Sequence, residues 1–105
     1  MDKFIRNFFS NHIRFFQSQL PSDEKTYDFN YSIATTDWRA LKKEIHRYSL
    51  SPQTINDLEQ LFRLAEDFTY SLKSFERYSV AISSLTSKWK EVQSFAGKFK
   101  ISPYL

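Results

Sequence analysis

Cysteine is absent from this chain of 105 residues, which excludes disulfides, thiolate zinc sites, iron–sulfur clusters and cysteine nucleophiles. Glycine occurs once and proline three times. Sandwiches, barrels and dinucleotide-binding folds need many tight turns, so this composition argues against them. A single glycine also leaves no glycine-rich phosphate loop and no nucleophile elbow. No run of about 18 apolar residues is present, and a membrane-spanning helix is therefore not expected.

Aromatic residues, in contrast, are abundant. Eleven Phe, six Tyr and two Trp make up 18% of the chain, which is enough to build a packed core and excludes wholesale disorder. The length fits one domain of the usual size, about 100–150 residues. The net charge of +3 permits an acidic partner without requiring one. Arg6, His12 and Arg14 interrupt the region where an export signal would need an apolar core, so a cytoplasmic location is expected.

The first predicted element is an amphipathic helix over residues 2–20. Asp2 stands at its start, where the helix dipole favours an anion, and Pro21 ends it. The apolar residues fall within one arc of the helix, which is typical of a core-facing element: Phe4, Ile5, Phe8, Phe9, Ile13, Phe15, Phe16 and Leu20. A helix lying on a membrane surface is the less favoured interpretation, because a bundle this small needs the Phe face for its core.

Residues 21–36 break the helical period. After a polar loop, Tyr27, Phe29, Tyr31 and Ile33 alternate with polar residues, which predicts an extended aromatic segment over residues 27–33. Two alternatives follow for it. The segment lies as a strap across the helices, or it pairs as a strand with residues 99–101 or with a second copy of itself.

A second helix is predicted over residues 37–49, capped by Thr36 or Asp37. Its apolar stripe is Trp38, Leu41, Ile45 and Tyr48. The opposite side carries a set of positive residues that we call the basic strip: Arg39, Lys42, Lys43, His46 and Arg47. Such a strip is usually only a solvated helix face, but it is also the best candidate here for contact with an acidic protein surface or with phosphates.

A new helix is expected at Ser51 and Pro52, which read as an N-cap followed by proline at the first helical position. From here a heptad pattern predicts one long helix over residues 52–96, about 68 Å long if unbroken. The a and d positions are Leu61, Leu64, Phe68, Ser71, Phe75, Tyr78, Ile82, Leu85, Trp89, Val92 and Ala96. Small and apolar residues at e and g favour a bundle over a two-stranded zipper. Residues 83–87 form helix weakly and are the predicted site of any break.

An unbroken helix of that length would leave an open apolar flank, which predicts an antiparallel homodimer with two-fold symmetry. The expected interface consists of Leu72, Phe75, Tyr78, Ile82, Leu85, Trp89, Val92 and Phe95. If the helix breaks instead, its last part folds back and covers the core of its own chain. The molecule would then be a monomer.

Neither histidine indicates a metal or catalytic site. His12 lies within the Phe-rich arc, either as a buried pH switch or ligand, or, as we favour, as a partly buried residue bonded to its neighbours. His46 is expected on the surface. No Glu-x-x-His pair or activated nucleophile is recognisable, so no enzyme activity, metal or cofactor is expected.

The sequence thus predicts a single all-α domain, a small helical bundle over residues 1–105. Its expected function is that of a non-enzymatic protein-interaction module, acting as an adaptor, inhibitor or regulator through helix–helix contacts. The alternative is a small nucleic-acid-binding regulator that uses the basic strip.

Overall fold

The computed structural model describes residues 3–78 and 82–101, with side chains described outside residues 75–83. The all-α class is confirmed, since this part of the chain is a bundle of helices without a strand. The molecule measures 44 × 21 × 21 Å. The elements are α1 (Lys3–Asn7), a π-helical segment η1 (Phe8–Ile13), α2 (Arg14–Gln17), α3 (Glu24–Lys43), a 3-10 turn η2 (Ile45–Arg47), α4 (Pro52–Tyr78) and α5 (Ile82–Ala96).

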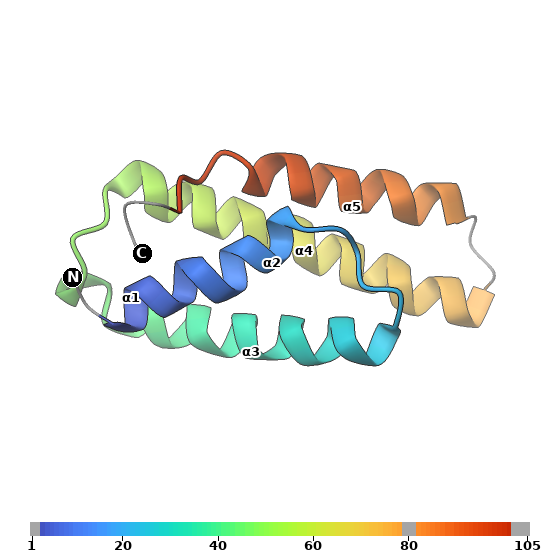
Figure 1. Cartoon of the computed structure of the whole chain (residues 1–105), viewed down its shortest axis with the longest axis horizontal. Helices are drawn as coiled ribbons and strands as arrows, with labels where there is room; N and C mark the ends of the chain where they lie inside the picture. Colours follow the sequence, from blue (N-terminus) through green and yellow to red (C-terminus); the bar gives the residue numbers. More distant parts are fainter. Residues whose placement is uncertain (1–2, 79–81, 102–105) are drawn as a thin grey trace.

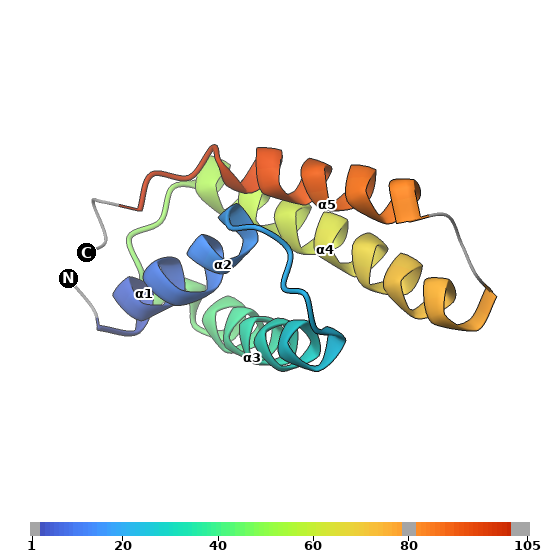
Figure 2. The ribbon, with the colours of Figure 1, turned by 45° about the vertical axis from the view of Figure 1, so that its right-hand side comes forward.

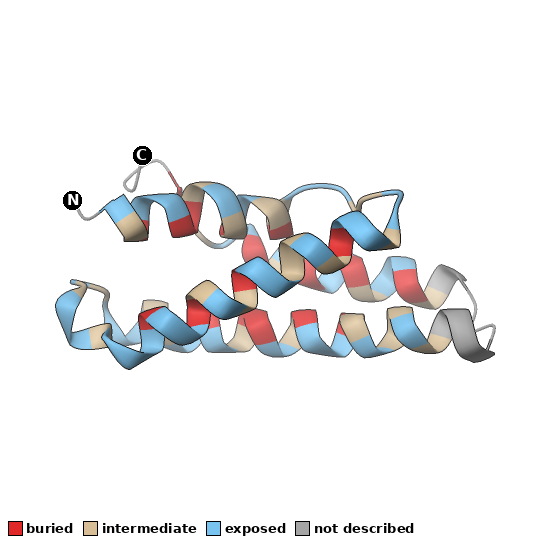
Figure 3. Ribbon diagram, turned by 90° about the horizontal axis from the view of Figure 1, so that it is seen from below, coloured by how far each residue is buried: buried red, intermediate tan, exposed pale blue. Residues whose placement is uncertain are grey.

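The N-terminal segment α1–η1–α2 packs between α3 and α5, while α3 and α5 each run antiparallel to α4 (Figures 1 and 2). Buried residues recur along the side of each long helix that faces the others, with exposed residues on the outer side (Figure 3). This pattern is the one expected when amphipathic helices share one core.

The predicted first helix is confirmed over residues 3–17, although its middle turn is a π-helix. The Phe-rich arc faces the core as expected, with Phe8, Phe9, Ile13 and Phe16 almost fully buried. Because a π-helix turns less per residue than an α-helix, η1 rotates the residues after it relative to those before it.

The predicted extended segment over residues 27–33 is wrong, because these residues form the first half of α3. Asp23 caps this helix by accepting a 3.0 Å hydrogen bond from the backbone N–H of Lys25. Two of the alternating residues, Phe29 and Ile33, are exposed, at 65% and 38%. The side chains that reach the core follow a helical stripe that runs past the alternation: Tyr27, Ala34, Trp38 and Leu41.

The predicted start of the second helix is also wrong, because α3 already includes the residues expected to begin it. Thr36 and Asp37 lie inside α3 and do not cap a helix. The helix ends at Lys43, and the remainder of the predicted 37–49 helix is the short turn η2. The next expected start is confirmed, since the hydroxyl of Ser51 accepts a 3.1 Å hydrogen bond from the backbone N–H of Thr54 and α4 begins at Pro52.

A continuous helix over residues 52–96 is also wrong, whereas the alternative, in which the helix breaks and its last part folds back, is confirmed. The chain forms two helices, and α5 returns along α4 as an antiparallel hairpin (Figure 1). The helix α4 is described to Tyr78 and α5 from Ile82, and the weak helix formers at 83–87, the predicted site of the break, belong to α5. An apolar stripe can be buried against a partner helix or against the returning half of the same chain, and the heptad does not distinguish the two.

This hairpin buries part of the expected dimer interface within one chain. Leu85, Trp89 and Val92 are buried in the core of their own chain, so they are not accessible to a second copy. Leu72 and Phe95 are partly buried against the same core. The side chains of the other three residues, Phe75, Tyr78 and Ile82, lie outside the described part of the structure.

The indole of Trp89 is buried in the core, where it lies among aromatic rings from three other elements. The ring centroids are 5.1 Å from Phe68, 5.9 Å from Tyr27 and 5.9 Å from Phe15. Its Nε1–H donates a 3.1 Å hydrogen bond to the carbonyl of Ser18. Among the described residues, no buried side-chain nitrogen or oxygen lacks a hydrogen-bond partner, which is the condition for a stable core.

Candidate functional site

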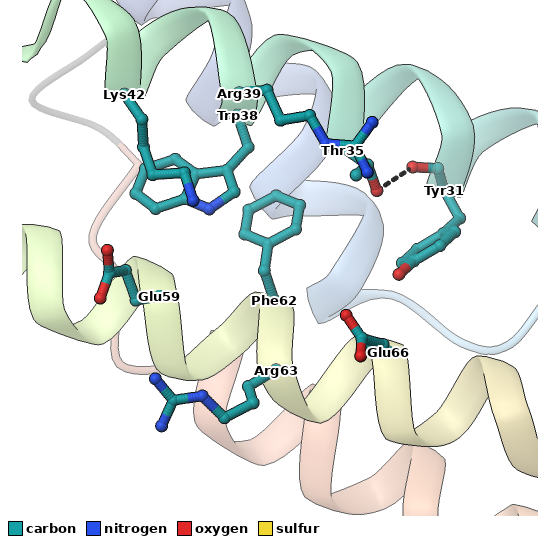
Figure 4. Close-up of a pocket in the computed structure, with 9 residues that line it drawn as sticks. All are labelled: Tyr31, Thr35, Trp38, Arg39, Lys42, Glu59, Phe62, Arg63 and Glu66. Carbon is teal, nitrogen blue, oxygen red and sulfur yellow. Dashed lines mark hydrogen bonds between the residues drawn. The ribbon is translucent and has the colours of Figure 1, made fainter.

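A groove between α3 and α4 is hollowed into the described surface (Figure 4). Its volume is about 320 Å³, at the small end of the range for ligand pockets. We call it the α3–α4 groove. Its lining residues are Tyr31, Thr35, Trp38, Arg39 and Lys42 of α3, and Glu59, Phe62, Arg63 and Glu66 of α4.

Specific side-chain contacts set the register of the two helices that form the groove. Toward one end, the ammonium of Lys73 lies 2.9 Å from Glu24 and 2.7 Å from Asp28. Next to this ion pair, the hydroxyls of Tyr27 and Thr69 are 2.7 Å apart, within hydrogen-bond distance. These contacts join α3 to α4 in the register that places the lining side chains opposite one another.

The floor of the groove is aromatic. The rings of Trp38 and Phe62 stack with centroids 5.4 Å apart and planes 4° apart. Phe8 of η1 packs beneath both, with centroids 6.2 Å from each. Trp38 and Phe62 are only 4% and 8% exposed, so the floor is a rigid continuation of the core.

The α3 rim of the groove is positive. Arg39 and Lys42 are exposed, and the ammonium of Lys42 lies 5.3 Å from the centroid of the Trp38 ring, a cation–π arrangement. Figure 4 shows both side chains extending along the open side of the floor. Within the described part of the chain, neither cation forms an ion pair with a carboxylate.

The α4 rim is negative. Glu59 and Glu66 are exposed and, among the described residues, they too have no ion-pair partner. Arg63 lies between them, but its side chain points away from α3 (Figure 4), and its Nη1 lies 3.4 Å from the side-chain oxygen of Gln60. The groove therefore has an aromatic floor and two rims of opposite charge.

The basic strip is exposed throughout but is divided by the structure. Arg39 and Lys42 line the groove, whereas Lys43 does not. His46 and Arg47 lie in η2 beyond the end of the helix, and the guanidinium of Arg47 lies 2.6 Å from Glu44. Only two of the five predicted residues are therefore brought together at the groove.

His12 lies outside the groove and joins the π-helical segment to α3. Its Nε2 is 2.6 Å from the Oδ2 of Asp37, its side chain is 13% exposed, and its ring meets that of Phe8 edge-on. The favoured interpretation of His12 as a partly buried residue bonded to a neighbour is confirmed. His46 is exposed, as expected.

Sequence reasoning missed the floor of the groove and the two glutamates of the α4 rim, Glu59 and Glu66. Trp38 was placed on an apolar stripe, but on a helix that began too late. The helical spacing of Tyr27, Tyr31, Ala34 and Trp38 was the available signal, since it extends the stripe of α3 back toward Glu24.

The comparisons with known proteins give no relative for this chain. It matches no family model, and neither the curated proteins nor the solved structures give a significant match. In the described part of the chain, no helix is long and apolar enough to cross a membrane, and no group of three or more His, Asp or Glu residues is placed to hold a metal ion. What the chain binds is therefore inferred from the chemistry of the groove.

Proposed function

We propose that this chain is a non-enzymatic protein-interaction module that docks a segment of a partner protein in the α3–α4 groove, as an adaptor, inhibitor or regulator. The observation that carries the proposal is the α3 rim. Arg39 and Lys42 border an open groove with an aromatic floor, and in the described structure neither is ion-paired with a carboxylate. Acidic side chains of a docked segment would supply the missing partners.

The floor supports the proposal because a partner that covers it would also exclude water from the rim. An ion pair on an open surface contributes about 0–1 kcal/mol. Hydrogen bonds between Arg and a carboxylate are stronger where both are partly desolvated, and Arg and aromatic residues are enriched at protein interfaces. An apolar side chain of the partner, seated over Trp38 and Phe62, would exclude water from Arg39.

Nucleic acid is the alternative partner, because the basic strip offers several cations near the end of α3. The facing rim argues against it. Glu59 and Glu66 lie across the groove from Arg39 and Lys42, and these carboxylates would repel a phosphate backbone. A protein segment can present both signs of charge and an apolar side chain, so it matches the groove better.

Selection from a random peptide library tests the proposal. The intact protein should enrich peptides with an apolar residue next to Asp or Glu, and binding should weaken as salt rises. Arg39→Ala and Lys42→Ala should each weaken binding about five- to tenfold. Lys90→Ala, which removes an exposed lysine of α5, is the matched control and should leave binding unchanged.

Two results would overturn the proposal. One is a selection that enriches no peptide above background. The other is a set of enriched peptides that binds Arg39→Ala and Lys42→Ala as tightly as the unaltered chain, since binding would then lie elsewhere.

A further inference from the structure

The two rims of the α3–α4 groove retain their opposite charges because they do not neutralise one another. An ion pair between Arg39 or Lys42 and either glutamate would have to cross the aromatic floor, and in the described structure no such pair is within 4.0 Å. Arg63 is directed away from α3 and, among the described residues, it forms no ion pair with Glu59 or Glu66, so both carboxylates remain unpaired on the α4 rim. Each rim therefore presents its charge to an occupant of the groove.

The spacing of the charges indicates the conformation of that occupant. Arg39 and Lys42 are separated by three residues, about 4.5 Å along the axis of α3, and Glu59 and Glu66 by seven residues, about 10.5 Å along α4. A helix presents side chains on one flank at the same intervals of three, four and seven residues. An extended strand spaces the side chains of one face about 6.6–7 Å apart, which matches neither interval.

We infer that the occupant is an amphipathic helix of the partner protein, with acidic side chains on the flank that faces α3 and basic side chains on the flank that faces α4. The inference rests on the proposed function and specifies the partner's chemistry. The apolar face between the flanks lies over Trp38 and Phe62, which is the helix-in-groove mode of recognition. A uniformly acidic helix is disfavoured, because one of its flanks would face Glu59 and Glu66.

Three synthetic helical peptides with the same apolar face test this inference. The first carries Glu on one flank and Lys on the other, the second carries Glu on both flanks, and the third carries Lys on both. Fluorescence anisotropy at low salt should give the mixed peptide an affinity about tenfold higher than either uniform peptide. This advantage should largely disappear in about 1 M salt, where charges are screened beyond about 3 Å.

A charge-reversed protein provides the second arm. The double variant Glu59→Lys and Glu66→Lys makes both rims positive, and it should prefer the peptide with Glu on both flanks. The matched control is Glu91→Lys, which reverses an exposed carboxylate of α5 and should keep the preference for the mixed peptide. Because all of these positions are exposed, the variants should fold normally, which circular dichroism would verify.

The outcomes separate the two proposals. Equal affinity of the unaltered protein for the mixed and the all-Glu peptides would overturn the inference of a two-signed helix while leaving docking in the groove intact. An unchanged preference in the charge-reversed protein would also overturn the inference. The absence of binding by all three peptides would overturn both the inference and the proposed function.

Discussion

Trp38 and Phe62 lie face to face, with their planes 4° apart, although they come from different helices. Phe8 packs against both rings, so the floor of the groove belongs to the central core. A variant that removes the floor will therefore change stability as well as binding. Tests of binding should alter the exposed rims instead.

Phe62→Ala should strongly destabilise the fold. Removing a buried aromatic ring costs about 3–5 kcal/mol, because apolar burial is lost and a cavity remains between α3 and α4. Urea unfolding followed by circular dichroism measures the change in the free energy of unfolding. Tyr70→Ala, at a residue of α4 that is 67% exposed, should change it by less than about 0.5 kcal/mol. Equal costs for the two variants would show that Phe62 is not part of the core.

Tyr27 should make the fold sensitive to high pH. Burial raises the pKa of its phenol above the ordinary value of 10.0, despite the hydrogen bond with Thr69. Below pH 10 the phenol is neutral in both the folded and the unfolded chain, so this group does not lower the free energy of unfolding. As the pH rises above 10, the unfolded chain loses this proton and the folded chain keeps it, so stability falls by up to about 1.4 kcal/mol per pH unit.

Tyr27→Phe removes this titration and should flatten the alkaline loss of stability. Part of the loss will remain, because Asp28 and Glu24 raise the pKa of Lys73, and that stabilisation also disappears as the pH rises through the raised pKa. Chemical unfolding between pH 8 and pH 11 measures both effects. Tyr70→Phe is the matched control for an exposed phenol. If Tyr27→Phe and the unaltered protein show the same alkaline slope, the phenol of Tyr27 is not buried.

The contact between His12 and Asp37 should contribute to the attachment of η1 to α3. Asp37→Ala leaves the partly buried imidazole without its partner, which should cost about 1–3 kcal/mol. A double-mutant cycle with His12→Ala should give a coupling of about 1 kcal/mol at neutral pH. His46→Ala, at an exposed position of η2, should have little effect. A coupling near zero would mean that the 2.6 Å contact does not stabilise the fold.

The hairpin changes the predicted oligomeric state. The expected homodimer depended on a continuous helix with an open flank, and α5 now covers that flank within one chain. We therefore expect light scattering to give a mass near 12.6 kDa that does not change on dilution. A mass of about twice that value would return the dimer to consideration, with an interface other than Leu85, Trp89 and Val92.

Duplex DNA offers a direct test of the alternative function. We expect no retardation of a duplex at low ionic strength beyond the weak binding that any exposed lysines give. A nucleic-acid-binding regulator would instead lose affinity steeply with salt, and Lys42→Ala and Lys43→Ala would each reduce the slope. That outcome would favour the alternative over docking of a protein helix.

Parts of the fold could be predicted because they depend on local sequence. The Phe-rich arc specifies the buried side of the first helix, and the hydroxyl of Ser51 and the ring of Pro52 specify the start of α4. The error at residues 27–33 has a physical cause. Tyr27 and Tyr31 are separated by four residues, which fits a helix as well as an alternating strand, and the exposure of Phe29 could not be read from sequence.

The groove could not be predicted because it depends on contacts between distant residues. Its floor forms where Trp38 of α3 meets Phe62 of α4, and the register between two helices is not encoded in the period of either. The choice between a continuous helix and a hairpin could not be made from sequence for a related reason. A stripe of apolar residues indicates that one side of a helix is covered, but it does not indicate which segment covers it.

The contacts that join α2 to α5 and to the residues after it have a consequence for the order in which the core forms during synthesis. The side-chain amide of Gln17 donates hydrogen bonds to the carbonyls of Ala96 and Phe99, at 2.8 and 3.0 Å, and Phe16 packs on Trp89. Synthesis proceeds from the N-terminal side of a chain, so residues 16 and 17 leave the ribosome well before their partners at 89–99. Phe16 can therefore meet Phe62 before it meets Trp89, and its packing is complete only after α5 has been synthesised.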